Sequence, residues 1–293
     1  MIPEEFIERF SRIVPHEGDP RSCFLAKKFR SFRVNALKAD RVGIFTQLRT
    51  QGIHFQEVPW YPDAFIVDLI HAKQLLTSPL CVQGMIYAQG LESMLAPIVL
   101  DPRPGWQVLD LCAAPGSKTT QIAALMDNQG NIMANEPVRD RFFRLKAVVE
   151  LLGAQVKLVS KDGRSFRGDG TFDGVLVDAP CSSEGRFCVD NPKSYAFWSK
   201  HKVHAMAHKQ KALLLNAGRL LKKGGTLVYA TCTFGKEENE DVVDWFLQKT
   251  EGQFKLESID LKDVPTYASS MPPCVRIMPG EFMEGFFLAK FSS

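Results

Sequence analysis

The stretch WQVLDLCAAPGSKTTQIA (residues 106–123) decides the fold class of this chain. A short apolar run leads to Asp110, a turn of small residues follows, and Ser117 opens a segment with helical spacing. The same alternation continues along the chain. It predicts strands over 106–111, 131–135, 156–160, 174–178, 226–231 and 285–291, and helices over 117–127, 137–152 and 203–222.

Short apolar strands that alternate with amphipathic helices are typical of a doubly wound, mostly parallel α/β sheet of the Rossmann-like kind. We expect this domain over residues 81–293. The preceding residues 1–80 predict a small α+β domain, with a helix over 3–14, a strand over 31–37, a helix over 41–52 and two further strand-like pieces. A connecting helix is expected over YAQGLESMLAPIVL (87–100).

The composition is that of an ordinary globular protein, with 45% hydrophobic residues and a net charge of +3. No apolar run is long enough to predict a membrane span, and MIPEEFIERF lacks the basic start of a signal peptide. Seven cysteines without CxxC spacing predict free thiols rather than a disulfide framework or a metal site. We therefore expect a cytoplasmic protein with neither a metal nor a membrane partner.

Ligands of doubly wound sheets bind at the carboxyl ends of the strands, where this chain places Asp110, Glu136, Asp162, Asp178 and Cys232. The turn after the first strand carries neither a GxGxxG fingerprint nor a P-loop, because Ser117 precedes Lys118. Its small residues and the following helix N-terminus favour a carboxylate ligand. The predicted contacts of this turn are Cys112, Ala113, Ala114, Pro115, Gly116, Ser117 and Lys118.

The acids after the next strands extend this cofactor site. Glu136 suits ribose hydroxyls, Asp162 suits an adenine amino group, and Arg141 is a further candidate one turn beyond Glu136. A nucleoside with an amino-acid tail fits this set better than a pyrophosphate does. The sequence therefore predicts S-adenosylmethionine as cofactor, with Asp178 also at its site. The alternative to a cofactor site is an ordinary strand–turn–helix in which these acids have no ligand.

Two cysteines follow predicted strands, in VLVDAPCSSEG (175–185) and in LVYATCTFGKEENE (227–240). With DLCAAPGSKT (110–119), FRVNALK (32–38) and GFFLAKF, these motifs resemble the RNA 5-methylcytosine methyltransferases of the NOL1/NOP2/Sun family over nearly the whole chain. The resemblance implies that Cys232 attacks C6 of cytosine, that Cys181 assists product release and that Asp178 polarises the base. Lys118 is the candidate cation for keeping a thiolate present.

Alternatives remain open for the two thiols. In DNA cytosine-C5 methyltransferases the nucleophile is the cysteine after proline, which is Cys181 here, but that assignment leaves Cys232 without a role. Both cysteines could also be small buried hydrophobic residues. Two rival functions stay open as well: an RNA-binding scaffold without activity, and an exocyclic-amine methyltransferase, whose motif differs from DAPC.

Two basic stretches with interleaved aromatic residues, 21–49 and 191–223, each contain eight Lys or Arg residues and predict RNA as partner. The alternative is a solvated basic face with core aromatics. By resemblance, Arg33 and Asn35 lie near the target nucleotide. APGSKTTQI, ANE and DGRSF resemble the bacterial enzymes that act on small-subunit (16S) ribosomal RNA. Those enzymes carry a C-terminal RNA-binding extension beyond the point where this chain stops, so tRNA remains the alternative substrate.

Overall fold

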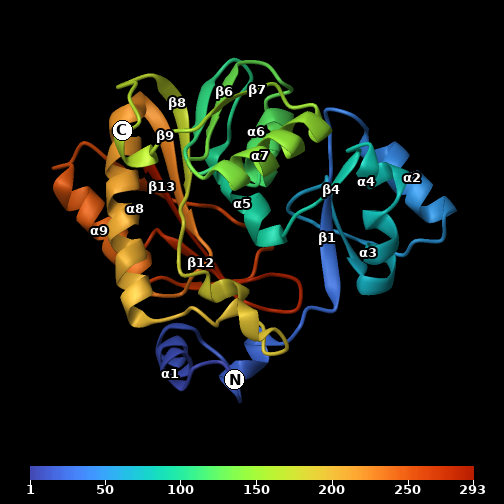
Figure 1. Cartoon of the computed structure of the whole chain (residues 1–293), viewed down its shortest axis with the longest axis horizontal. Coiled ribbons are helices and arrows are strands. Elements are labelled where there is room, and N and C mark those ends of the chain that lie inside the picture. The colour runs from blue at the N-terminus through green and yellow to red at the C-terminus, as the bar shows by residue number, and fades with distance from the viewer.

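The computed structural model describes residues 1–293 and is built around one large mixed sheet (Figure 1). The strand order is β11-β12-β13-β9-β8-β5-β6-β7, and β10 pairs with β13 outside this path. The five strands β5 to β9 are parallel, and β13 joins β9 antiparallel. The strands span Gln107–Asp110 (β5), Asn131–Asn135 (β6), Val156–Val159 (β7), Phe172–Asp178 (β8), Leu221–Thr231 (β9), Lys255–Glu257 (β10), Thr266–Ala268 (β11), Val275–Ile277 (β12) and Phe286–Ser292 (β13).

Helices cover both faces of this sheet because its strands are apolar on both sides. Alternate residues face opposite cores: Leu176 packs with the core under α5 and α6, whereas Val175 and Val177 pack with the core under α8 and α9. The predicted doubly wound Rossmann-like fold is confirmed. The helices span Leu91–Leu100 (α5), Ser117–Leu125 (α6), Arg139–Leu152 (α7), Lys200–Leu220 (α8) and Glu240–Lys249 (α9).

A small antiparallel sheet, in the order β2-β3-β1-β4, lies beside the large one (Figure 1). Its own apolar core contains Phe32, Phe45 and Phe65. Its elements span Phe29–Val34 (β1), Arg41–Thr50 (α2), Gln56–Glu57 (β2), Ala64–Asp68 (β3), Leu69–Leu76 (α3), Pro79–Val82 (α4) and Ile86–Ala88 (β4).

The helix expected over 87–100 starts later than predicted, at Leu91. Residues Ile86–Ala88 instead form β4, whose partner is β1, with Phe32 opposite Ala88 and Val34 opposite Ile86. Gly90 caps the helix that follows. The small sheet therefore extends past residue 80. The sequence did not predict this strand, because its pairing with β1, more than fifty residues earlier, leaves no mark on the local pattern of apolar residues.

The first helix, α1 (Glu4–Ile13), packs on the large unit and not on the small sheet (Figure 1). Its Phe6 ring lies 4.8 Å from that of Phe187, and its Phe10 ring lies 4.9 Å from that of Phe234. The amphipathic pattern of 3–14 correctly predicted a helix with one buried face, but such a pattern does not say what covers that face. None of the helices in the structure combines the length and the apolar character that a membrane crossing needs.

Candidate active site

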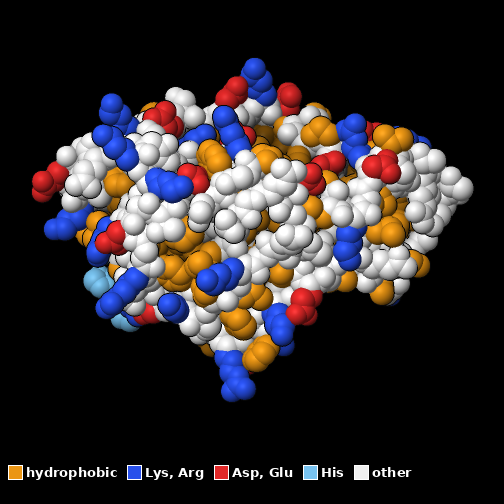
Figure 2. Space-filling view, turned by 90° about the horizontal axis from the view of Figure 1, so that it is seen from above, with side chains coloured by type: hydrophobic (Ala, Val, Ile, Leu, Met, Phe, Trp, Pro, Cys, Tyr) orange, Lys and Arg blue, Asp and Glu red, His pale blue; other side chains and the backbone are white.

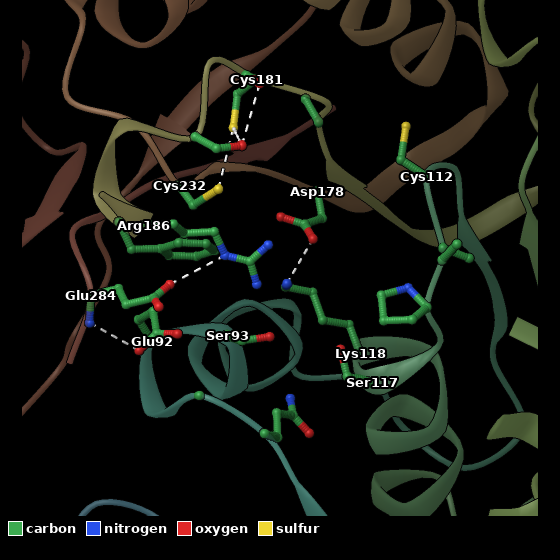
Figure 3. A pocket seen from close by; sticks show the side chains of 18 of the residues that line it. Glu92, Ser93, Cys112, Ser117, Lys118, Asp178, Cys181, Arg186, Cys232 and Glu284 are labelled. Atoms are coloured by element: carbon green, nitrogen blue, oxygen red, sulfur yellow. Dashed lines mark hydrogen bonds and ion pairs between the residues drawn. The ribbon is translucent and has the colours of Figure 1, made fainter. Parts of the chain in front are cut away.

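A cavity of about 270 Å³ opens where the parallel strands end, between the large unit and the segment that joins it to the small sheet (Figure 3). Most of its wall comes from four segments: the turn after β5, the loop after β8, the loop after β9, and residues 87–93 around the start of α5. Arg141 of α7 and Glu284 and Phe286 at the start of β13 complete the wall. The predicted residues Cys112, Ala113, Ala114, Pro115, Ser117, Lys118, Arg141, Asp178, Cys181 and Cys232 all lie on this wall. The fold thus brings together residues that are more than a hundred positions apart in the sequence, as the motifs predicted.

The turn before α6 has the shape that the sequence predicted. Gly116 has φ +111°, and a Cβ there would lie 3.1 Å from Leu145 and 3.2 Å from Val148 of α7. Only glycine suits this combination of backbone angle and close approach. The first N–H groups of α6 follow at Ser117 and Lys118, at the cavity wall. They supply donors for a carboxylate ligand.

Asp110 at the end of β5 gives a test of whether the predicted cofactor fits this cavity. Its Oδ2 accepts a hydrogen bond of 2.6 Å from Thr119, whereas its buried Oδ1 has no partner. Burial raises the pKa of this carboxyl to about 7. A buried acceptor without a partner at a cavity wall suits a ligand that carries a cationic or N–H donor group. The ammonium tail and sulfonium of S-adenosylmethionine meet that requirement.

Two acids expected to bind the cofactor, Glu136 and Asp162, do not line the cavity. Glu136 is buried, accepts from the N–H of Val138 at 2.9 Å, and forms an ion pair of 3.3 Å with Arg141. Arg141 does line the cavity and donates to the carbonyl of Ala114 at 2.9 Å. The contact of Glu136 with ribose therefore stays a prediction.

Asp162 also lies outside the cavity wall, at the surface. It caps a short 3-10 helix, η2 (Gly163–Ser165), and pairs with Arg164 at 2.6 Å. Hydrogen bonds from Arg164 lower the pKa of Asp162 to about 2. Its contact with adenine stays a prediction, and it would require the aspartate to exchange partners.

Cys181 and Cys232 lie at the end of the cavity away from the turn before α6, with their Sγ atoms 3.3 Å apart (Figure 3). The two thiols are not equivalent. The hydrogen bond that Cys181 donates lowers the pKa of Cys232, and the same bond raises the pKa of Cys181. The arrangement favours the thiolate form at Cys232 and the thiol form at Cys181, which suits a nucleophile with a proton donor beside it.

Glu184 ties together the loops that carry these cysteines. Its Oε2 accepts from the Thr233 hydroxyl at 2.7 Å and from the N–H groups of Phe234 and Gly235 at 3.0 Å. Its Oε1 accepts from the indole of Trp198 at 2.8 Å. This buried carboxylate therefore fixes the loop after β8 against the loop after β9.

Glu238 makes a second link of the same kind. Its Oε2 accepts from the N–H of Ser182 at 3.0 Å and from the amide of Gln210 at 2.8 Å. Burial raises the pKa of Glu238 to about 7. These cross-links explain why the motifs DAPCSSEG and TCTFGKEENE both continue beyond their cysteines.

Asp178, at the end of β8, pairs with Lys118 at 2.6 Å (Figure 3). Lys118 thus forms an ion pair with Asp178, whereas we expected it to be the cation beside the thiolate. Arg186 also lines the cavity, and its charge helps to lower the pKa of Cys232. Sequence reasoning missed Arg186, although it directly follows the quoted motif.

Arg33 and Asn35 lie inside the protein and have no exposed surface with which to bind RNA directly, so their place near the target nucleotide stays a prediction. Arg33 donates to Gln89 at 3.2 Å and to Thr120 of α6 at 3.3 Å. Asn35 donates to the carbonyls of Gly84 and Leu152, both at 2.8 Å. Both side chains join the small sheet to the large unit, a role that motif position alone does not distinguish from substrate contact.

The aromatic residues of the two basic stretches divide between core and surface. Phe24, Phe32 and Tyr195 are buried, whereas Phe197 is 83% exposed. Figure 2 shows Lys and Arg side chains spread over one face among acids and apolar groups, with histidines gathered at one edge. Phe24, Phe32 and Tyr195 are therefore core residues, as the alternative interpretation expects. Of the basic residues in these stretches, Arg33 is buried, whereas others such as Lys28, Arg30 and Lys193 are exposed.

An open, mainly parallel sheet with a nucleoside-sized cavity at its strand ends and a thiol pair on the wall defines a group-transfer enzyme of Rossmann-like fold. The family model described as 16S rRNA methyltransferase RsmB/F matches residues 97–292. The chain belongs to this family, the S-adenosylmethionine-dependent RNA cytosine-C5 methyltransferases of the NOL1/NOP2/Sun type.

Two curated relatives show how far the similarity extends. The tRNA (cytosine(49)-C(5))-methyltransferase of Pyrococcus abyssi is 38% identical over 304 residues, which cover 99% of this chain and 96% of the relative. Ribosomal RNA small subunit methyltransferase F of Shewanella oneidensis is 41% identical over 273 residues, which cover 90% of this chain and 57% of the relative. The chain thus spans little more than half the length of the bacterial relative.

Solved structures share the fold over the whole chain. The crystal structure of PH0851 superposes with a TM-score of 0.89 at 35% identity and covers 100% of this chain and 66% of the other. The structure of NSun6 from Pyrococcus horikoshii, described with the S-adenosylmethionine analogue SFG, has a TM-score of 0.86 at 23% identity, with 99% and 98% covered.

Proposed function

We propose that the chain methylates C5 of a cytosine in RNA through a covalent adduct at Cys232, which Cys181 helps to resolve. The observation that carries this proposal is the pair of sulfurs 3.3 Å apart, of which Cys232 has the lowered pKa and Cys181 the raised one. The thiolate is the nucleophilic form of cysteine, so Cys232 suits the attack and Cys181 does not. This supports Cys232 over the assignment typical of DNA enzymes.

The Cys232 thiolate adds to C6 of the cytosine, and the ring's electrons make C5 nucleophilic. Bound S-adenosylmethionine supplies the methyl group that C5 takes up. Water that reaches the open cavity then takes up the C5 proton, the electron pair of the C5–H bond re-forms the C5–C6 double bond, and the Cys232 thiolate is expelled. The hydrogen bond from Cys181 stabilises that thiolate both before attack and as it leaves.

Asp178 and Lys118 act on the base in this proposal. Asp178 faces the cavity from the end of β8, where it can accept from the N4 amino group or hold a proton at N3. Lys118, bonded to Asp178 at 2.6 Å, orients that carboxylate. Such fixed charges stabilise the electron density that builds up in the ring when the thiolate adds.

A denaturing gel of the Cys181→Ala protein expressed in cells tests the division of labour between the cysteines. We expect a slow-migrating, nuclease-sensitive band, because the adduct forms at Cys232 and does not resolve. The band should disappear in the Cys181→Ala/Cys232→Ala variant and be absent from Cys188→Ala, a cysteine outside the cavity. If no band forms while wild type methylates RNA, the assignment is wrong; RNA binding without methyl transfer would favour the scaffold.

We infer small-subunit ribosomal RNA as the substrate class, acted on in the cytoplasm. The family description and the 41% identity to the Shewanella enzyme support this inference. Transfer RNA is the second candidate, favoured by the match to the Pyrococcus enzyme over 96% of its length. Sequencing the RNA released from the trapped band decides between them: reads from 16S rRNA support the first, and reads from tRNA support the second.

A further inference from the structure

Arg186 occupies a position that the surrounding backbone fixes closely. It ends the short 3-10 helix η3 (Glu184–Arg186), which lies between the end of β9 and the start of β13. The N–H of Gly185 donates to the carbonyl of Cys232 at 2.9 Å. A Cβ at Gly185 would lie 2.2 Å from the carbonyl oxygen of Gly285, so only glycine permits this approach. The neighbouring side chain is thereby held beside Cys232.

Glu284 holds Arg186 from its other side, and Glu92 anchors the backbone of Glu284. The Nε of Arg186 pairs with Oε2 of Glu284 at 3.3 Å (Figure 3). The N–H of Glu284 in turn donates to Oε2 of Glu92 at 3.1 Å. Glu92 is 5% exposed and lies in the first turn of α5. Three charged side chains that the methyl-transfer mechanism leaves unused thus form a chain along the cavity wall.

The terminal groups of Arg186 face the cavity. Its protein hydrogen bond comes from Nε, and in Figure 3 its guanidinium points into the space between Cys232 and Asp178. The Arg186 side chain is 65% exposed, so water screens its charge in the open cavity. A base inserted into the cavity would displace that water and strengthen the interaction between the guanidinium and the sulfur.

We propose that Arg186, set in place by Glu284 and Glu92, is the cation that holds Cys232 as a thiolate. The inference deepens the proposed function, since it concerns the same nucleophile. Lys118 is already committed to Asp178, and no other Lys or Arg on the cavity wall lies on the same loop pair as the cysteines. Glu284 and Glu92 are positioning residues in this account, because they act on the thiol only through Arg186.

The charged and titratable groups around Cys232 set the direction of the expected effects. Cys181 donates to its sulfur, Asp178 faces it across the cavity, and Glu238 lies behind Cys181. On the far side of Arg186 lie Glu284, Glu92 and Lys27. Of these, Arg186 and Cys181 favour the thiolate and Asp178 opposes it. Removing the guanidinium should therefore raise the pKa of Cys232.

The pH dependence of Cys232 alkylation by iodoacetamide tests this proposal without requiring methyl transfer. The full chain is alkylated for short times, and Cys232 is quantified by peptide mass spectrometry. We expect Arg186→Gln to move the midpoint upward and to slow alkylation at pH 7 about tenfold, which corresponds to about one pKa unit. Arg186→Lys should restore most of the rate, and Glu284→Gln should give an intermediate loss.

Arg167→Gln is the matched control, because Arg167 is an exposed arginine outside the cavity. An Arg186→Gln protein that folds and titrates like wild type would overturn the proposal, as would an Arg186→Lys protein no better than Arg186→Gln. The proposed function has a separate test. Methyl transfer by the Cys232→Ala protein would contradict it, whereas the alkylation results for Cys232 in the wild-type and Arg186 proteins would still stand.

Discussion

The carboxylates around the two ends of the cavity differ in their partners. At the cysteine end, Glu184 and Glu238 are buried and accept hydrogen bonds from the backbone of the loops that carry the thiols. At the end predicted to hold the cofactor, Glu136 is equally buried and Asp162 is exposed, but each pairs with an arginine whose side chain is 43% or 51% exposed. The carboxylates of the first end hold the protein's own loops together, whereas those predicted to bind the cofactor also have an exposed partner that a ligand could replace.

This difference agrees with what each end has to do. A thiol that must attack one ring carbon needs a loop geometry set before substrate arrives, and buried hydrogen bonds to backbone supply it. A cofactor that binds and leaves in every cycle needs partners that exchange at low cost, and exposed ion pairs contribute little to stability. The contrast can be tested by removing carboxylates from each end.

The largest effect is expected for Glu184→Ala. Three donors to Oε2 and the indole of Trp198 would lose their acceptor in a buried site. Unsatisfied buried groups cost about 1–3 kcal/mol each, so we expect the free energy of unfolding to fall by about 3 kcal/mol or more. Urea denaturation measures this loss, and the adduct band should weaken with it.

Glu281→Ala serves as the control for that experiment, because Glu281 is exposed and makes no side-chain hydrogen bond or ion pair. It should change stability by less than about 0.5 kcal/mol. Equal losses in the two variants would show that the buried hydrogen bonds of Glu184 do not stabilise the cysteine end.

The second prediction uses pH at Glu238. Its pKa is about 7 in the folded protein against 4.5 ordinarily, so the folded state binds this proton more tightly than the unfolded state does. The resulting stability is present below about pH 4.5 and is lost as the pH rises through 7. Glu238→Gln stays neutral throughout, so relative to wild type it should gain about 2–3 kcal/mol between pH 4.5 and pH 8.

Urea midpoints of both proteins across this range provide the measurement. Glu281→Gln, the exposed counterpart, should follow the wild-type curve. A constant difference between Glu238→Gln and wild type at every pH would show that the pKa of Glu238 is the same in the folded and unfolded states, and would contradict the prediction.

The third prediction concerns the cofactor end. Replacing a carboxylate that binds ribose removes charge-assisted hydrogen bonds worth about 1.5–3 kcal/mol, so Glu136→Gln should weaken S-adenosylmethionine binding about tenfold or more. Isothermal titration calorimetry measures the affinity. If Arg141→Ala weakens binding as much as Glu136→Gln does, then Glu136 serves only to hold Arg141, and the predicted ribose contact is wrong.

The smallest effect is expected for Arg164→Ala, which removes the partner of Asp162. The pair is exposed, so the free energy of unfolding should change by less than about 0.5 kcal/mol, and this difference should vanish at about 1 M salt. Thermal or urea unfolding at two salt concentrations measures it. A loss above about 1 kcal/mol would mean that the cofactor end also depends on fixed carboxylates.

The sequence predicted the parts of this molecule whose pattern is local. The central strands appear within a few residues of their predicted positions, and the cysteines of two separate motifs meet because parallel strands end at one edge of the sheet. β4 was missed because its three residues form a strand only through pairing with β1. α1 was predicted as a helix, but its partners lie in loops that only the tertiary fold brings near.

Charged side chains were harder to place than apolar ones. Lys118, Arg33 and Arg186 are all cations near predicted motifs, yet one pairs with Asp178, one is buried between the two units and one faces the thiol. Their roles depend on which carboxylates or carbonyls lie within about 3 Å, and a sequence does not contain those distances.

The placement of α1 has a consequence for how the chain comes into being on the ribosome. Arg9 reaches Glu237, 228 positions later, and Phe10 packs on Phe234. At about 5–20 residues per second, the helix emerges about ten seconds or more before its binding face exists. Its phenylalanines have no partners from this part of the chain during that interval, so α1 completes its docking only after a segment made much later has folded.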